Sequence, residues 1–89
     1  MKTARLTLAA FTIGKFNDRV RQQELGLVVT FGPGWVEITA PESVLRYVAD
    51  TFSDRADVGD LGEFHTANER RSCRTAAARI RAVLSHPSR

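Results

Sequence analysis

The sequence is poor in cysteine and contains no long apolar run. Its single cysteine, Cys73, excludes an internal disulfide framework and fits a reducing compartment, so we expect a cytoplasmic protein. The apolar stretch at residues 6–14 is far shorter than the roughly 20 residues that span a membrane. Lys2 and Arg5 before it resemble the start of a signal peptide, but threonines interrupt the stretch and no convincing cleavage site follows. We therefore expect no membrane partner.

Residues that usually carry catalysis are also scarce. His65 and His86 flank the last predicted helix, about 28 Å apart at about 1.5 Å per residue, which is too far to share a metal. No cysteine and histidine spacing fits zinc, and Asp57 with Asp60 offers too few ligands for a calcium loop. Nucleophile elbows, phosphate-binding loops and dinucleotide fingerprints are missing. We therefore expect no enzyme activity, no cofactor and no metal site.

The chain has 89 residues, of which 43% are hydrophobic and 26% are charged. These proportions are typical of a folded globular protein rather than a disordered one. The length allows one domain with one modest core, so we assign residues 1–89 to a single domain.

The first predicted strand covers residues 5–13, in which Leu6, Leu8 and Ala10 alternate onto one face. Residues 14–26 are ambiguous, because apolar residues recur there at helical spacing but a glycine and an asparagine interrupt them. A helix and a long charged connection with one helical turn fit this segment equally well.

The clearest local signal is Gly32-Pro33-Gly34 between two strand-like segments, residues 27–31 and residues 35–40. Proline presets φ for the first central turn position, and the following glycine accepts a positive φ at the second. This sequence predicts a type II turn that closes a β-hairpin. Alternation along residues 35–40 predicts one buried and one half-exposed face of the sheet.

Two helices should follow the hairpin. The first begins at Pro41, which suits the first helical turn, and ends near Ser53. Its apolar stripe consists of Val44, Leu45, Val48 and Phe52. An acidic loop is expected at residues 54–64.

The last helix is predicted for residues 66–85. Thr66 and Glu69 form a capping box at its start, and Pro87 stops it. Its core face consists of Cys73, Ala76, Ala77, Ile80, Val83 and Leu84. The order is thus strand, strand, strand, helix, helix, with one further helix if residues 14–26 are helical. We predict an α+β fold with a small antiparallel sheet of about three strands, covered on one face by two helices.

Charge is distributed unevenly along the chain. The net charge is +3, yet residues 1–60 contain seven basic and eight acidic residues. Residues 61–89 contain six arginines and only two acids, so the whole excess lies there. This asymmetry points to a partner with phosphate or carboxylate groups, although a preference of the genome for arginine codons would also produce it.

The last helix concentrates these arginines. At 100° per residue, Arg70, Arg74 and Arg81 share a sector of about 40°, with Arg71 to one side and Arg79 pointing elsewhere. Such an edge could contact the phosphates of a nucleic acid or an acidic protein surface. A solvated polar face is the alternative interpretation.

Trp35 and Phe31 flank the predicted turn. On the exposed sheet face they could stack on a base or anchor a protein partner. The alternative, which we favour for Trp35, is that it covers the edge of a small core. The candidate partner-binding residues are Arg70, Arg71, Arg74, Arg81 and Trp35.

A strip of small residues lies opposite the core face of the last helix. It consists of Thr75, Ala78, Ala82 and Ser85. Small side chains allow another helix to approach closely, so a homodimer through this helix is one hypothesis, with the acidic residues of the 54–64 segment meeting the arginines.

Two functions remain on these grounds. The first is a small non-enzymatic protein that occupies a surface of a larger protein or nucleoprotein complex. Phages and mobile elements encode proteins of this size to block host defence machinery, including CRISPR effector complexes, and the analogy is one of size alone. The alternative is direct nucleic-acid binding by the arginine-rich last helix.

Overall fold

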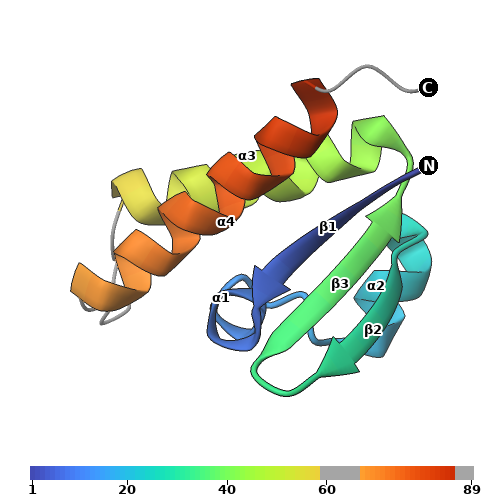
Figure 1. Cartoon of the computed structure of the whole chain (residues 1–89), viewed down its shortest axis with the longest axis horizontal. Coiled ribbons are helices and arrows are strands. Elements are labelled where there is room, and N and C mark those ends of the chain that lie inside the picture. Colours follow the sequence, from blue (N-terminus) through green and yellow to red (C-terminus); the bar gives the residue numbers. More distant parts are fainter. Residues whose placement is uncertain (59–66, 86–89) are drawn as a thin grey trace.

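The computed structural model describes residues 1–58 and 67–85. In these residues the chain forms three strands and four helices (Figure 1). Their order is β1 (Lys2–Thr7), α1 (Leu8–Ile13), α2 (Arg19–Leu25), β2 (Val28–Gly32), β3 (Trp35–Ala40), α3 (Glu42–Val58) and α4 (Ala67–Ser85). The predicted α+β fold with a three-stranded antiparallel sheet is confirmed.

The sheet has the order β1-β3-β2, so β3 is the central strand. The predicted hairpin is confirmed, because Gly32 pairs with Trp35 across a connection of Pro33 and Gly34. Gly34 has a φ of 73°, the left-handed conformation that the turn requires. Burial alternates along β3 as expected, and every second residue of this strand lies in the core.

The predicted strand at residues 5–13 is wrong in its second half. β1 already begins at Lys2 and ends at Thr7, where α1 starts. The Thr7 hydroxyl oxygen accepts a hydrogen bond from the backbone N–H of Ala10 at 3.2 Å and thereby caps α1. This cap redirects the chain, so Leu8 is exposed, whereas Ala10 and Phe11 are buried within the helix instead of alternating along a strand.

The ambiguous segment at residues 14–26 is helical in its second half. Asp18 caps α2 by accepting a hydrogen bond from the N–H of Val20 at 2.9 Å. Gly26 ends the helix with a φ of 72°. Two short helices therefore separate β1 from β2, and an N-cap side chain lies at the start of each.

α3 extends beyond the end that we predicted near Ser53. It continues to Val58, because Ala56 follows Phe52 by one turn and is also buried. The expected loop at residues 54–64 is therefore wrong for residues 54–58, and its remainder lies outside the described residues.

α4 ends at Ser85, where the sequence predicted its end. Its predicted core face is confirmed for the four fully buried residues Cys73, Ala76, Ala77 and Ile80. Val83 and Leu84 are partly buried against the same core. Thr66, His65, His86 and Pro87, to which the sequence assigned roles at the ends of this helix, lie outside the described residues.

The core lies on one side of the sheet. In Figure 1, α2 lies behind the sheet, α1 lies beside the end of β1, α3 lies behind α4, and α4 runs beside β1. Three phenylalanine rings fill the centre, with ring centroids 6.4 Å apart for Phe11 and Phe16 and 5.5 Å apart for Phe16 and Phe52. The other sheet face carries no helix, and we call it the open face.

Lys2 connects the start of β1 to both long helices. Its ammonium group donates hydrogen bonds to the carbonyl oxygens of Val83 at 3.3 Å and Leu84 at 3.4 Å. It also forms an ion pair with Glu42 at 3.0 Å, and this hydrogen bond is the main reason why the pKa of Glu42 is lowered. None of the described helices is long and apolar enough to cross a membrane.

Candidate functional site

Two of the predicted binding arginines turn toward α3. Arg70 is half-buried, and its Nε donates a hydrogen bond to the carbonyl oxygen of Ala56 at 3.0 Å. Arg81 is exposed and forms an ion pair with Asp50 at 3.1 Å. Both residues therefore hold α4 against α3. Asp50 offsets the charge of Arg81, whereas the carbonyl of Ala56 only directs the Arg70 side chain toward α3.

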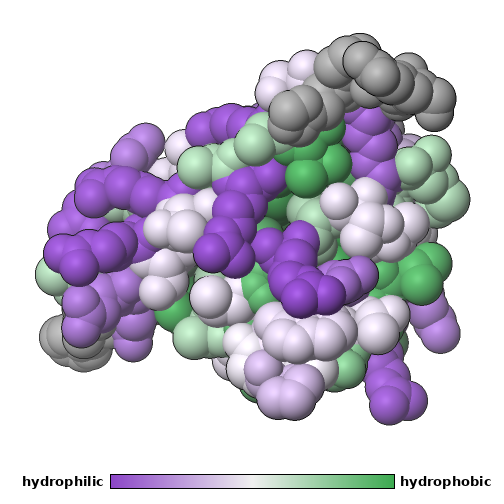
Figure 2. All heavy atoms as spheres, in the orientation of Figure 1, coloured by the Kyte–Doolittle hydropathy of each residue, from purple (hydrophilic) through white to green (hydrophobic). Residues whose placement is uncertain are grey.

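The arginines on the outward side of α4 are different. Arg71 and Arg74, both predicted binding residues, are exposed, and so is Arg79. None of the three forms a hydrogen bond or ion pair with a residue that the structure describes. Hydrophilic residues gather over the N-terminal half of α4, at the left of Figure 2. The free positive charge of α4 is thus carried by Arg71, Arg74 and Arg79.

The strip of small residues between these arginines is open to solvent. Thr75, Ala78, Ala82 and Ser85 are all exposed. We call the surface formed by Arg71, Arg74, Thr75, Ala78, Arg79 and Ala82 the α4 face. It combines three cations that have no partner among the described residues with short side chains that permit close approach.

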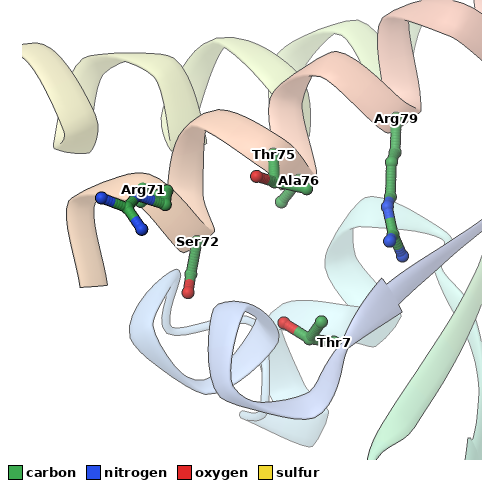
Figure 3. A pocket seen from close by; sticks show the side chains of 6 residues that line it. All are labelled: Thr7, Arg71, Ser72, Thr75, Ala76 and Arg79. Carbon is green, nitrogen blue, oxygen red and sulfur yellow. The ribbon is translucent and has the colours of Figure 1, made fainter. Parts of the chain in front are cut away.

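A pocket lies where the α4 face meets the junction of β1 and α1 (Figure 3). It has a volume of about 140 Å³ and is lined by Thr7, Arg71, Ser72, Thr75, Ala76 and Arg79. In Figure 3, Ser72 extends from α4 toward the side on which Thr7 lies, while Arg79 reaches down along the other end of the pocket. None of the described residues that line it is acidic. We call it the α4–β1 pocket.

The hydroxyl groups of this pocket are available as donors. Helical threonines often donate to the carbonyl one turn earlier, as Thr12 does to Leu8 at 3.1 Å and Thr51 does to Tyr47 at 2.9 Å. Ser72 and Thr75 form no such bond with any described residue. The hydroxyl of Thr7 accepts from Ala10, so its own proton remains free to donate.

Trp35 and Phe31 lie on opposite faces of the sheet, which corrects the expectation that both could share the exposed face. Phe31 pairs with the buried Val36 and therefore points to the helical side, where its ring contacts Phe11 edge-on at 6.0 Å. Trp35 pairs with Gly32 and lies on the open face. The two aromatic rings therefore cannot stack on one ligand together.

The indole of Trp35 is held in place from two sides. A side-chain carbon at Gly32 would lie 2.1 Å from ring atoms Cε2 and Cζ2, so the ring covers this glycine closely. The Arg5 guanidinium lies 4.2 Å from the ring centroid and pairs with Glu37. A base could stack on Trp35 only if Arg5 moved away. The ring covers Gly32 on the open face, whereas the interpretation that we favoured placed it at the edge of the core.

Comparison with family models, with curated proteins and with solved structures finds no match. The chemistry of the surface itself therefore has to indicate the function. Among residues 1–58 and 67–85, no group of three or more histidine, cysteine or acidic residues could hold a metal ion.

The α4–β1 pocket and the open face are continuous. Thr7 lines the pocket and is the direct cross-strand neighbour of Trp35. Such neighbours have side chains about 5 Å apart, so the pocket reaches the open face beside the indole ring. Projection of α4 alone missed Arg79 and Thr7, because only the tertiary placement of β1 against α4 brings them together.

The contact between Gly32 and Trp35 gives a first prediction. Gly32→Ala should displace the indole, because the new methyl group would overlap the ring. We expect a shift of tryptophan emission to longer wavelength and a loss of about 1 kcal/mol in stability, since crowding costs about 1–3 kcal/mol and this ring can move outward. Thr30→Ala, on the same exposed strand face, is the control and should leave the emission spectrum unchanged. An unchanged spectrum for Gly32→Ala would contradict the close packing of this ring.

Proposed function

We propose that the chain is a cytoplasmic, non-enzymatic binding protein that occupies an anionic surface of a larger protein or nucleoprotein complex through the α4 face. The observation that supports this proposal most strongly is the set of three exposed arginines, Arg71, Arg74 and Arg79, that have no partner among the described residues. Arginine is enriched at interfaces because its planar guanidinium binds carboxylates and phosphates in a bidentate manner.

The shape of the α4 face also supports binding to a large partner. Ala78 and Ala82 leave the helix backbone accessible between the arginines, so a flat or convex partner can approach closely. The open face with Trp35 continues this surface across Thr7, which extends the contact area beyond one helix. Stable interfaces bury about 800 Å² on each partner, more than one helix face alone provides.

Such binding would act by occupation of a surface. A small protein without catalytic groups can block a larger machine by covering the site that its substrate or nucleic acid needs. We therefore extend the proposal to an inhibitor of the kind that phages and mobile elements direct against host defence complexes, including CRISPR effector complexes. The support for this extension is size and surface charge alone.

Matched variants test the α4 face. A tagged wild-type chain is used to capture partners from cells, and two variants are compared: Arg74→Glu, which reverses charge, and Ala78→Tyr, which adds bulk without charge. Both should reduce capture of the same partner at least about tenfold, equal to about 1.4 kcal/mol. Arg19→Glu makes the same charge reversal on α2, and Gln23→Tyr introduces the same tyrosine there; both positions are exposed, and neither variant should have an effect. Equal capture by all four variants would refute the proposal.

Direct nucleic-acid binding is the second candidate, and the unpaired arginines favour it as well. Affinity for a duplex should fall by about 0.9 log unit per log unit of salt for each neutralised phosphate. A gel shift without binding at low salt would exclude this candidate and leave a protein surface as the partner.

The homodimer through α4 also remains a prediction. The exposed strip of Thr75, Ala78, Ala82 and Ser85 offers the small surface that it needs, and Asp54 and Asp57 at the end of α3 are exposed acids. Light scattering of the wild type and of Ala78→Tyr would distinguish a dimer that the variant dissociates from a monomer that it leaves unchanged.

A further inference from the structure

We infer that the α4–β1 pocket binds a phosphate group. This inference deepens the proposed function and rests on it only in part, since the pocket shares Arg71, Thr75 and Arg79 with the α4 face. It names the chemical group of the partner, and it can be tested without the partner itself.

The pocket offers hydrogen-bond donors from two separate elements. α4 contributes the guanidinium group of Arg79 and the hydroxyls of Ser72 and Thr75, while β1 contributes the hydroxyl of Thr7 (Figure 3). Arg71 also lines the pocket, but its guanidinium lies at the opposite end from that of Arg79 and points outward. Arg71, Thr75 and Arg79 follow each other at intervals of four residues, so they form one row of about 12 Å along the helix. Thr7 faces this row from the other side of the pocket.

The number of these donors favours phosphate over carboxylate. A carboxylate is planar and has two oxygens, which a single arginine can satisfy through a bidentate pair. A phosphate has more acceptor oxygens arranged in a tetrahedron, so it can accept bonds from an arginine, a helix hydroxyl and an opposing threonine at once. Arginine, serine and threonine side chains are the usual donors to phosphate oxygens.

The charge balance of the pocket points the same way. Its two arginines have no acidic partner among the described residues, and none of the described residues that line it is acidic. The groove between α3 and α4, lined by Arg46, Asp50, Arg81, Leu84 and Ser85, differs because Asp50 already pairs with Arg81. An anion therefore gains more from the α4–β1 pocket, where Arg79 has no acidic partner among the described residues.

The test is a titration of the isotope-labelled chain followed by amide NMR at fixed low ionic strength. Inorganic phosphate should shift the amide signals of residues 7–8 and 71–79 and saturate. Arg79→Gln should weaken this binding at least about tenfold, and Thr75→Val, an exposed change of equal size, should weaken it by a smaller factor. Arg19→Gln and Thr30→Val remove the same groups from exposed positions elsewhere and should leave the affinity within twofold.

Two further ligands identify the source of the phosphate. A short single-stranded oligonucleotide that binds more tightly than inorganic phosphate, through the same residues, would indicate the backbone of a nucleic acid. Equal affinities would indicate a free phosphate or a small phosphorylated molecule. Oligoglutamate that shifts the same signals as strongly as phosphate, with no effect of Thr75→Val, would overturn the inference in favour of an acidic protein.

Failure of the inference and failure of the proposed function have different signatures. Ala78 does not line the pocket, so Ala78→Tyr should lose the macromolecular partner but retain phosphate binding. Absence of any saturable shift at residues 7–8 and 71–79 would refute the phosphate site while leaving the partner capture intact. Circular dichroism of each variant verifies that the fold is preserved.

Discussion

Replacement of Phe52 by alanine should lower the free energy of unfolding by about 3–5 kcal/mol. The side chain is 0% exposed and lies on α3 in the centre of the phenylalanine cluster. Its ring is also packed against backbone, because a side-chain carbon at Gly14 would lie only 2.6 Å from its Cε1 atom. Neither the Phe16 ring nor the backbone at Gly14 can easily move into the space that the Phe52 ring would leave. Truncation should therefore create a cavity in addition to removing buried apolar surface.

The matched control is Phe31→Ala, which removes the same ring from a side chain that is 59% exposed. It should cost less than about 1 kcal/mol, because most of its surface is already in water and only its edge contact with Phe11 is lost. Urea unfolding monitored by circular dichroism measures the free energy of unfolding of both variants. A domain of this size has roughly 4–13 kcal/mol of stability, so Phe52→Ala should be marginally folded. Equal losses for the two variants would contradict the placement of the core.

Patterns that depend on neighbouring residues could be predicted from the sequence. The hairpin follows from Gly34, whose positive φ permits the tight turn between the end of β2 and the start of β3. The core face of α4 follows from helical spacing, which brings Cys73, Ala77 and Ile80 to one side.

The errors occurred where two local preferences compete. Thr7 favours a strand by its branched side chain, but its hydroxyl also caps a helix, and the second preference prevails at this position. The end of α3 was missed because Asp54 and Asp57 suggested a loop, whereas the buried Ala56 between them extends the apolar stripe by one turn.

The candidate site could be predicted only in part for a different reason. A helical projection gives the direction of each arginine but not the element that it meets. The helical projection placed Arg70 and Arg81 in one row with Arg74. In the structure, however, both Arg70 and Arg81 form hydrogen bonds to residues of α3. The α4–β1 pocket depends on contacts between residues more than 60 positions apart, such as Thr7 and Ser72, which no local pattern reports.

The thiol of Cys73 should react with thiol reagents at least about a thousandfold more slowly in the native chain than in denaturant. The residue is 1% exposed on the core face of α4, and burial raises its pKa by disfavouring the thiolate, which is the reactive form. Labelling should therefore require opening of the structure. Phe52→Ala lowers the free energy that opening requires. Since about 1.4 kcal/mol corresponds to a tenfold change, labelling of Cys73 in this variant should be about a hundredfold faster or more.

Ala78→Cys provides the control for this labelling, because position 78 is exposed on the same helix and its thiol should react as fast as that of a free peptide.

The pH dependence of the stability has a defined sign. Because the pKa of Cys73 is higher in the folded state, the unfolded chain loses its thiol proton first as pH rises above about 8.5. Stability should thus be retained below this pH and decrease above it, and Cys73→Ser should remove that decrease. Rapid labelling of Cys73 in the native chain at neutral pH would show that α4 separates readily from the core, and both the α4 face and the α4–β1 pocket require that it does not.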